Sequence, residues 1–497
     1  MPEIINIENV SYSYPGKKEP ALEEVSLSVH EGEFLAIMGE NGSGKTTLCG
    51  LVNGIIPHFF GGKFLGTVIV DGERADKSSV PSLALKAGMV LDDPDTQLFT
   101  SSARHEAAFG PENLLLPVEE IERRVEWALG AVGLDGFQPR PPSTLSGGEK
   151  QRLAIAAALT MNGKILVLDE PLCRLDPQGS ERIMSVLKDI REKYGTTIIM
   201  ASHDSGMTRR YADRVCVLRG GRVAAIDTTE NIFADSDLLE RNGIQPLDEK
   251  NPQSREELFF EDSSRAPPET QRNSAIEIKN LSFSYPNGEG IENINLSIYE
   301  NDFMAITGRN GCGKTTLLKN ITGLLPPSRG DILIRGKSVK DLSVSSISRE
   351  IGFVTQNPDN QLFTGSVYDE VTFALNNLKL SKTEKEERAR NALNVVGLED
   401  VTAFPRACHR ADRTKIIIAC VIAMDCKIII LDEADIGQDY RGNKMIMDLA
   451  GKLRSMGYTI IFVTHNMALV NGYADRLIIM ERNGIVMDRA RSNFYER

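Results

Sequence analysis

GENGSGKTT occupies Gly39–Thr47 of this chain, and GRNGCGKTT occupies Gly308–Thr316. Both stretches fit the pattern G-x-x-x-x-G-K-[ST]. Each also follows an apolar run, Phe34–Met38 or Phe303–Thr307, of the kind that forms a strand. Glycines let the backbone curl until successive N–H groups point at phosphate oxygens, and the start of a following helix adds partial positive charge. The two stretches therefore predict two phosphate-binding loops, each between a strand and a helix.

The side chains of these loops suit a nucleotide with its magnesium ion. Lys45 and Lys314 are expected to bridge the outer phosphates, and Thr46 and Thr315 to offer a hydroxyl to Mg²⁺. We therefore expect ATP and Mg²⁺ as cofactors. The predicted nucleotide-binding residues of the loops are Gly39, Asn41, Gly42, Gly44, Lys45, Thr46 and Thr47, with Gly308, Asn310, Gly311, Gly313, Lys314, Thr315 and Thr316.

A second motif, LDE, ends an apolar run in each half of the chain. Asp169 and Asp432 stand at the strand ends, where a carboxylate can reach Mg²⁺ directly or through water. Glu170 and Glu433 follow at once, and each is expected to orient or deprotonate the attacking water. The pairing of this motif with the phosphate loops predicts hydrolysis of the nucleotide.

Two histidines and two tyrosines recur at matching positions in the halves. His203 and His465 each follow a further apolar run, and we expect each to polarise the γ-phosphate and the water through a hydrogen bond. Tyr14 and Tyr285 precede a proline near the start of each half, where a ring could stack on adenine. Burial of the two tyrosines as ordinary core residues is the alternative.

These recurrences reflect an internal repeat. GMVLDDPDTQLF at Gly88–Phe99 pairs with GFVTQNPDNQLF at Gly352–Phe363, and the whole halves align in the same way. Such a long period indicates a duplicated domain rather than a solenoid. We predict one domain over residues 1–244, an acidic, proline-rich linker over 245–274 and a second domain over 275–497. Apolar runs that alternate with helical stretches predict α/β domains.

The composition fits a globular protein with no membrane span. The 497 residues are 41% apolar and 25% charged, and the net charge is −12. This acidic balance argues against a nucleic-acid partner, since such proteins present a basic face. No apolar run approaches the roughly 18 residues that a membrane-spanning helix needs.

LSGGEKQR, at Leu145–Arg152, occurs in the first half only. Phosphate loop, LSGGEKQR, LDEP, CRLD at Cys173–Asp176 and strand-end histidine follow one another in the order of ATP-binding-cassette (ABC) ATPases, which this chain resembles over both halves. The resemblance implies two P-loop domains of α/β class. Each would have a mainly parallel core sheet, an antiparallel β subdomain and a helical subdomain.

Two further segments, Asp93–Leu114 and Asn357–Leu378, are similar to the ATPase subunits of energy-coupling-factor importers of vitamins and metal ions. This similarity implies an ATP-hydrolysing subunit at the cytoplasmic face of the cell membrane. Its partners would be a transmembrane coupling subunit and a membrane substrate-binding subunit. The candidate apolar contacts are Phe99, Phe109, Phe363 and Phe373, for which burial is the alternative. A soluble tandem ATPase that acts as a switch in translation or DNA maintenance remains the alternative function.

In ABC ATPases two domains pair head to tail, and each ATP touches the phosphate loop of one domain and the signature segment of the other. The resemblance assigns the intact signature to Ser146, Gly147, Gly148 and Glu149. The ungapped register from Leu145–Asp169 to Cys408–Asp432 puts His409, Arg410, Ala411 and Asp412 at the matching positions of the second half.

The glutamine that contacts Mg²⁺ and water in this family corresponds to Gln356, whereas the first half has Asp92. Both departures fall on the site built on Lys45. We therefore expect an internal pseudo-dimer with one hydrolytic site, built on Lys314, and one mainly structural ATP site.

Overall fold

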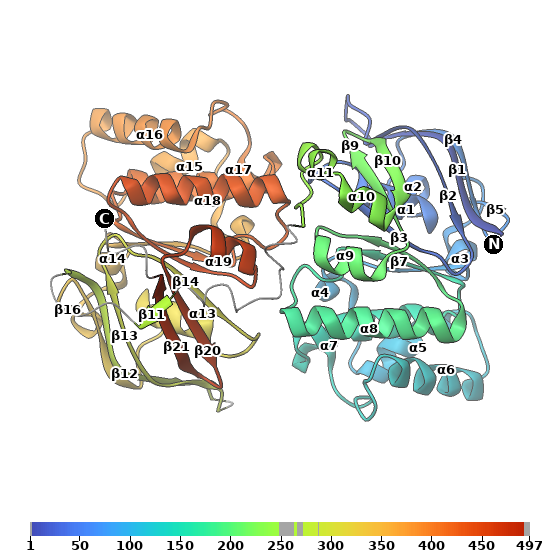
Figure 1. Cartoon of the computed structure of the whole chain (residues 1–497), viewed down its shortest axis with the longest axis horizontal. Coiled ribbons are helices and arrows are strands. Elements are labelled where there is room, and N and C mark those ends of the chain that lie inside the picture. The colour runs from blue at the N-terminus through green and yellow to red at the C-terminus, as the bar shows by residue number, and fades with distance from the viewer. Residues whose placement is uncertain (1, 248–262, 266–271, 287, 492–497) are drawn as a thin grey trace. The chain divides into compact units, whose positions relative to one another are not determined.

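The computed structural model describes residues 2–247, 263–265, 272–286 and 288–491 (Figure 1). The chain divides into two compact units, Met1–Leu247 and Asp248–Arg497, and each is described by itself. The predicted linker, residues 245–274, lies largely outside the described residues. The predicted domain boundaries at 244 and 275 stay predictions.

A mainly parallel sheet forms the centre of unit one. Its order is β10-β9-β3-β8-β7-β6, and β10 alone runs antiparallel to its neighbour. The strands β3, β7 and β8 are buried along their whole length, as expected for apolar runs covered on both faces. The strands of this sheet are β3 (Phe34–Gly39), β6 (Ala87–Val90), β7 (Ile165–Asp169), β8 (Thr197–Ala201), β9 (Arg214–Arg219) and β10 (Arg222–Thr228).

An antiparallel sheet of order β2-β1-β4-β5 covers one side of this core, and helices cover the other (Figure 1). The antiparallel strands are β1 (Glu3–Ser13), β2 (Leu22–His30), β4 (Lys63–Val70) and β5 (Glu73–Arg74). The helices of unit one are α1 (Lys45–Val52), α2 (Ile55–His58), α3 (Val80–Ala84), α4 (Pro94–Gln97), α5 (Ala103–Asn113), α6 (Val118–Ala131), η1 (Pro142–Thr144), α7 (Gly147–Leu159), α8 (Pro177–Tyr194), α9 (Ser205–Tyr211), α10 (Thr229–Ala234) and α11 (Ser236–Arg241).

Unit two repeats this plan. Its core sheet has the order β11-β21-β20-β14-β19-β18-β17 and its second sheet the order β13-β12-β15-β16. The strands are β11 (Ser263–Arg265), β12 (Ser274–Ser284), β13 (Gly290–Tyr299), β14 (Phe303–Gly308), β15 (Arg329–Ile334), β16 (Lys337–Ser338), β17 (Ile351–Val354), β18 (Ile428–Asp432), β19 (Thr459–Val463), β20 (Arg476–Glu481) and β21 (Gly484–Arg491). The helices are α13 (Lys314–Ile321), η2 (Val339–Asp341), α14 (Val344–Ile347), η3 (Pro358–Gln361), α15 (Val367–Ala374), α16 (Lys382–Val396), η4 (Pro405–Ala407), α17 (Arg410–Ala423), α18 (Tyr440–Ser455) and α19 (Met467–Tyr473).

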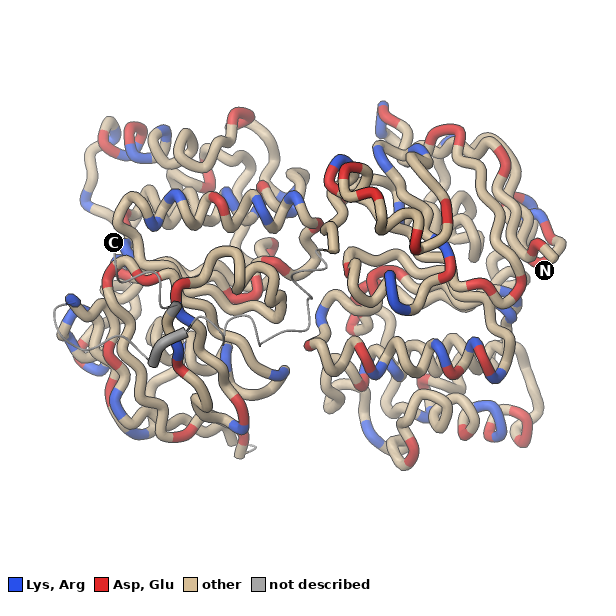
Figure 2. The backbone as a smooth tube through the Cα atoms, in the orientation of Figure 1, with Lys and Arg blue, Asp and Glu red and all other residues tan. Residues whose placement is uncertain are grey.

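The predicted fold class is confirmed in both units. Each core sheet packs between two apolar layers, one toward the antiparallel sheet and one toward helices, which are α5–α8 in unit one and α15–α18 in unit two. In the part of the chain that the structure describes, no helix is long and apolar enough to cross a membrane. Basic and acidic positions alternate along α8 and α16 (Figure 2), so both helices expose mixed charge.

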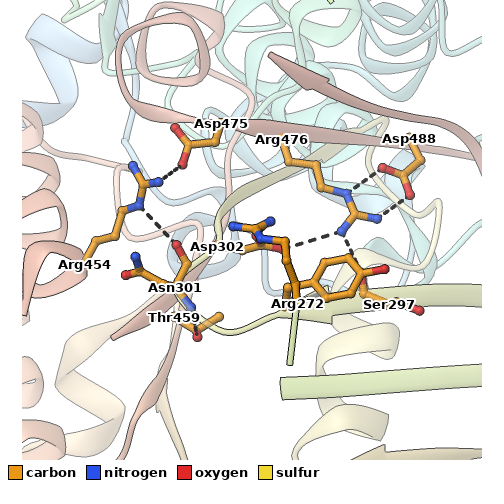
Figure 3. Close-up of polar contacts among 10 residues, drawn as sticks. Arg272, Ser297, Asn301, Asp302, Arg454, Thr459, Asp475, Arg476 and Asp488 are labelled. Atoms are coloured by element: carbon orange, nitrogen blue, oxygen red, sulfur yellow. Dashed lines mark hydrogen bonds and ion pairs between the residues drawn. The ribbon is translucent and has the colours of Figure 1, made fainter. Parts of the chain in front are cut away.

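A buried ion network joins the two sheets of unit two (Figure 3). The Arg476 guanidinium on β20 donates to both carboxylate oxygens of Asp488 on β21, at 2.7 and 2.5 Å, and to the Ser297 carbonyl on β13 at 2.6 Å. Asp302, just before β14, lies 3.6 Å from Arg476 and accepts a hydrogen bond from Arg272 at 2.9 Å. Arg476 and Asp302 are only 4% exposed. The network therefore connects the antiparallel sheet with the strand that leads into the phosphate loop.

Removing one partner of a buried charge network leaves the others without compensation, which costs about 3–5 kcal/mol. We expect Arg476→Met to lower the free energy of unfolding of unit two by that amount. Urea unfolding, read by hydrogen exchange of β20, measures it. The matched control is Lys382→Met, since Lys382 is 92% exposed and pairs with Glu386 at 3.9 Å on the surface. An effect no larger than that of the control would contradict the network's role.

Candidate active sites

Each phosphate loop leaves its strand at a glycine that no other residue can replace. Gly39 has φ +146°, and a Cβ there would lie 2.2 Å from the Leu218 carbonyl oxygen. Gly308 has φ +148°, with the Met480 carbonyl oxygen at the same 2.2 Å. Because L residues avoid such φ values and a side chain has no space, both loops depend on glycine here.

Each loop lysine donates hydrogen bonds to carbonyl oxygens of its own loop. The Lys45 amine donates to the carbonyl oxygens of Gly39 at 3.0 Å and Glu40 at 3.1 Å. The Lys314 amine donates to those of Gly308 at 2.7 Å and Arg309 at 3.1 Å. Both lysines are buried, and each amine is held against the start of its own loop. This arrangement suits the outer phosphates of a nucleotide.

The predicted magnesium residues meet in each unit. Thr46 contributes a hydrogen bond to Asp169, and Thr315 contributes one to Asp432. Burial raises the pKa of each aspartate to about 6, although the hydrogen bond from the threonine acts to lower it. One oxygen of each, Oδ1, is buried and accepts no hydrogen bond from any described residue. A carboxylate oxygen kept free beside a threonine hydroxyl fits Mg²⁺, which typically takes one or two protein oxygens with water and phosphate.

Among the described residues, no group of three or more His, Cys, Asp and Glu side chains is arranged to hold a metal ion. Such groups would form a metal cage made wholly of protein ligands. A magnesium ion carried in with the nucleotide does not require one.

In unit one, His203 and Glu170 are in contact. The ring nitrogen Nε2 of His203 lies 3.2 Å from Glu170 Oε1 and 3.0 Å from Asn41 Oδ1 of the phosphate loop. Glu170 also accepts the His203 backbone N–H at 3.2 Å. Its φ is +48°, a strained value for a residue with a side chain. The histidine therefore connects the LDE carboxylate with the loop.

Unit two repeats this geometry. His465 Nε2 lies 3.4 Å from Glu433 Oε1, 3.0 Å from Asn310 Oδ1 and 3.4 Å from the Lys314 amine. Glu433 has the same strained backbone, with φ +50°. The predicted catalytic glutamate and histidine of each half thus lie together beside their own phosphate loop.

The two glutamates differ in acidity. Burial raises the pKa of Glu170 to about 7 despite the Lys45 charge, and the Asp92 carboxylate raises it further. Burial also acts to raise the pKa of Glu433. There the hydrogen bond and charge of His465, with the Lys314 charge, outweigh burial and hold the pKa below its ordinary value. Glu433 is therefore the more fully ionised of the two at neutral pH.

The tyrosines stand beside the phosphate loops. The Tyr14 hydroxyl lies 3.1 Å from Thr47 Oγ1, and the Tyr285 hydroxyl lies 3.4 Å from Thr316 Oγ1. Each ring is half-buried. It packs edge to face against the aromatic ring two residues before it, and the two ring centroids are 4.9 Å apart. Full burial as core, the alternative weighed from the sequence, does not hold for either ring.

Comparison with known proteins matches both units to one family. The family model described as "ABC transporter" matches residues 22–173 and 291–435. The chain belongs to the ABC transporter family. It is an ABC ATPase with two ATP-binding cassettes in tandem.

Two relatives named as putative ABC transporter ATP-binding proteins align over nearly the whole chain. The protein from Caldanaerobacter subterraneus is 35% identical over 98% of this chain and 91% of its own length. The one from Methanosarcina acetivorans is 35% identical over 97% and 85%. A solved structure of CbiO1 from Clostridium perfringens, described as part of the ABC transporter complex CbiONQ, is 35% identical. It covers 48% of this chain and 94% of that chain, with a TM-score of 0.44.

The signature segment of the first cassette starts helix α7. Ser146 is the N-cap: its hydroxyl accepts the Glu149 N–H at 3.4 Å, and Glu149 accepts the Ser146 N–H at 2.8 Å. A Cβ at Gly147 would meet nothing within 4 Å, and one at Gly148 would meet only Leu175 at 3.6 Å. Packing within this unit therefore does not require glycine, although each helical glycine costs about 1 kcal/mol.

The corresponding start of α17 in the second cassette is filled by side chains. Its N-cap is His409, which makes no side-chain cap. The Arg410 guanidinium lies over Gly437, where a Cβ would be 3.3 Å from it, and donates to the Gln356 carbonyl oxygen at 3.4 Å. Ala411 packs against the core of its own unit. This segment is thus turned toward its own cassette.

The structure supports the register that pairs Asp92 with Gln356. Gln97 accepts the Leu91 N–H at 3.0 Å and donates to the Met89 carbonyl oxygen at 3.1 Å. Gln361 makes the same two contacts with Thr355 and Phe353, at 2.9 Å each. Gln97 is therefore a structural residue and no substitute for Gln356. Asp92 and Gln356 both lie exposed just beyond a core strand.

Sequence reasoning missed Asp435. Its Oδ2 lies 2.6 Å from Thr464 Oγ1, so this buried side chain contacts the residue before His465. Burial raises the pKa of Asp435 to about 6, against the hydrogen bond from Thr464. The first half has Leu172 at this position, and that difference within LDEAD and LDEPL was the available signal.

Asp435→Asn keeps the shape and a hydrogen bond but removes the ionisable group. The wild-type carboxyl, with its pKa raised from 3.8 to about 6, stabilises the fold below about pH 4 and loses that contribution as the pH rises to about 6. The variant should therefore gain stability relative to wild type by up to roughly 3 kcal/mol between pH 4 and pH 7.

Urea unfolding at pH 4 and pH 7, read by hydrogen exchange of β18, measures this difference. The exposed Asp341→Asn variant is the control and should follow wild type at both pH values. An Asp435→Asn advantage that is equal at the two pH values would contradict the assigned cause.

Proposed function

We propose that this ABC ATPase energises an importer of the energy-coupling-factor type, with a vitamin or a metal ion as its solute. In this proposal the chain sits at the cytoplasmic face of the cell membrane. There it binds a transmembrane coupling subunit and a membrane substrate-binding subunit. The names of its relatives, all putative ABC transporter ATP-binding proteins, support a transport role and do not favour the alternative in translation or DNA maintenance.

Two matched pairs of exposed phenylalanines support a role in docking to membrane subunits. Phe99 and Phe109 meet edge to face at 4.9 Å and are 68% and 45% exposed. Phe363 and Phe373 meet at 5.0 Å and are 63% and 50% exposed. Exposed apolar side chains grouped at equivalent places in two units are typical of a surface that a partner covers.

The loops that present these rings are held by a buried carboxylate. Glu106 accepts the N–H groups of Phe99 and Thr100 at 3.1 and 2.9 Å, and is 5% exposed. Glu370 accepts those of Phe363 and Thr364 at 3.0 and 2.9 Å, and is 3% exposed. Charge-assisted hydrogen bonds of this kind preorganise the surface before a partner arrives.

We expect the double variant Phe99→Ala, Phe363→Ala to lose about ten-fold or more of its affinity for the membrane subunits, because aromatic anchors dominate such interfaces. Co-purification from detergent extracts measures the loss, while ATP binding stays unchanged. Val344→Ala is the control, since Val344 is 51% exposed on another part of unit two. Full retention of the membrane subunits by the double variant would speak against docking on these rings.

We further propose that the two cassettes pair head to tail and form one competent and one degenerate ATP site. In the competent site, the Lys314 loop, Asp432, Glu433, His465 and Gln356 act with Ser146–Glu149 of the first cassette. The bare backbone at Gly147 and Gly148 supports this role, because nothing in its own unit needs those glycines. In the degenerate site, Arg410 and Ala411 replace them, and Asp92 adds negative charge beside Glu170.

Each residue of the competent site has a distinct task. Lys314 and the loop N–H groups hold the phosphates, and Asp432 and Thr315 hold Mg²⁺, which neutralises charge on them when bound. Glu433 orients the attacking water and accepts its proton, and His465 steadies Glu433 and the γ-phosphate. The first site keeps Lys45, Glu170 and His203, so it binds ATP and turns it over slowly.

Glu433→Gln should lower steady-state ATP turnover by about 10²-fold or more, since a positioned general base contributes about 10²–10⁴-fold. Glu170→Gln should change turnover by less than about three-fold, because its site contributes little of the total. Both variants should bind ATP as wild type does. Equal losses of ATP turnover in the two variants would contradict the assignment of one competent site.

A further inference from the structure

The loop Gly54–Gly66 of unit one presents two large rings to solvent. Phe59 is 80% exposed and Phe60 is 48% exposed. The matching stretch of unit two, Gly323–Gly330, is shorter and contains no aromatic residue. Two adjacent exposed phenylalanines in one half of a duplicated protein need a physical reason, because an exposed apolar pair adds nothing to folding.

The backbone of this loop is firmly held. The Tyr12 hydroxyl donates to the Gly61 carbonyl oxygen at 2.8 Å, and the Phe59 N–H donates to the Ile55 carbonyl oxygen at 2.8 Å. Gly62 has φ +94° and lies so close to β1 that a Cβ would be 2.3 Å from the Ser13 carbonyl oxygen. The rings are thus exposed by a fixed turn.

The exposed rings continue a row of aromatic side chains that begins at the phosphate loop. The Tyr14 hydroxyl lies 3.1 Å from Thr47 Oγ1, two residues after Lys45. Phe60 meets Tyr14 edge to face at 5.8 Å, and Phe59 meets Phe60 at 5.3 Å. This row of rings therefore connects the phosphate loop of unit one with the exposed phenylalanines.

Unit two lacks this extension. Tyr285 lies beside Thr316, and its aromatic neighbour is Phe283 of the same strand. The exposed apolar residue of its shorter loop is Leu324, which is 54% exposed and offers no π-face. The two sites thus have similar loops for the phosphates and unequal surfaces for the base.

We propose that Phe59 and Phe60 contact the nucleobase of the ATP bound to unit one and give that site the slower exchange of the two. This inference rests on the proposed function, in which the first site holds ATP without rapid turnover. Contact between a base and an aromatic ring tolerates any base and is lost on substitution by alanine. A site that keeps its ATP through many cycles benefits from such contact, whereas a site that must release ADP does not.

The test uses the full chain with Lys314→Ala, so that unit one supplies the remaining phosphate loop. Calorimetry measures the Kd for ATP and for inorganic tripolyphosphate, with and without Phe59→Ala, Phe60→Ala. We expect the Kd for ATP to rise about ten-fold or more, the scale of a lost base–aromatic contact, and the Kd for tripolyphosphate to stay unchanged. The fluorescence of Trp127, the single tryptophan of the chain, monitors folding of unit one.

Two controls isolate the aromatic face. Phe59→Leu, Phe60→Leu keeps apolar side chains on the loop and should still lose most of the ATP affinity. Leu324→Ala in a chain with Lys45→Ala is the matched change in unit two and should leave ATP affinity unchanged.

Several results would overturn the inference. Unchanged ATP affinity in both phenylalanine variants would do so, above all if capture of the membrane subunits fell, because the rings would then serve a protein partner. Equal losses for ATP and tripolyphosphate would assign the loop to support of the phosphate loop. Absence of ATP binding in the Lys314→Ala chain itself would remove unit one as an ATP holder. The turnover comparison of Glu433 and Glu170 involves none of these residues and fails or holds separately.

Discussion

In both cassettes, the phosphate loop depends on a residue without a side chain at the end of a central strand. At Gly39 and Gly308 the chain must turn with φ near +147° against the carbonyl oxygen of a neighbouring strand, at a distance no Cβ tolerates. The carbonyl oxygen of the same glycine accepts a hydrogen bond from the buried lysine amine of the loop. The fully buried parallel strands make this position rigid, so the LDE carboxylate and the strand-end histidine meet the loop at fixed distances.

The two signature segments also differ in whether they present bare backbone. Gly147 and Gly148 weaken α7, and packing within their own unit does not require glycine at either position. At the matching positions of α17, Arg410 and Ala411 are helix-forming residues. Both contact other residues of their own cassette. The first helix start thus combines a capping box with exposed glycine backbone, whereas the second has side chains at these positions and no side-chain cap.

Much of this architecture was predictable because the chain is duplicated. A motif seen once is ambiguous, but the same spacing between phosphate loop, LDE strand and histidine in both halves predicts the fold and the residues that meet. Gln97 illustrates the value of register: its equivalence to Gln361, and hence the loss at Asp92, follows from alignment and agrees with the hydrogen bonds observed.

Other features could not be predicted because they depend on three-dimensional exposure. The residues Phe99 and Phe363 have the same sequence signal as buried phenylalanines, and only the fold decides that they face solvent. Asp435 is ordinary in the sequence, and its burial beside Thr464 depends on the packing of two distant strands. The difference in pKa between Glu170 and Glu433 likewise depends on distances to lysine, histidine and Asp92 that no motif contains.

Several of these features distinguish unit one from unit two. Unit one has the aromatic loop, the raised pKa of Glu170 and the extra carboxylate of Asp92. Unit two has the ionised Glu433 in contact with His465, and the neutral Gln356. In the proposed head-to-tail pairing, the glycines of α7 would serve the ATP held by unit two. Hydrolysis at that one site would then be enough to reopen a pair that two bound ATP molecules had closed.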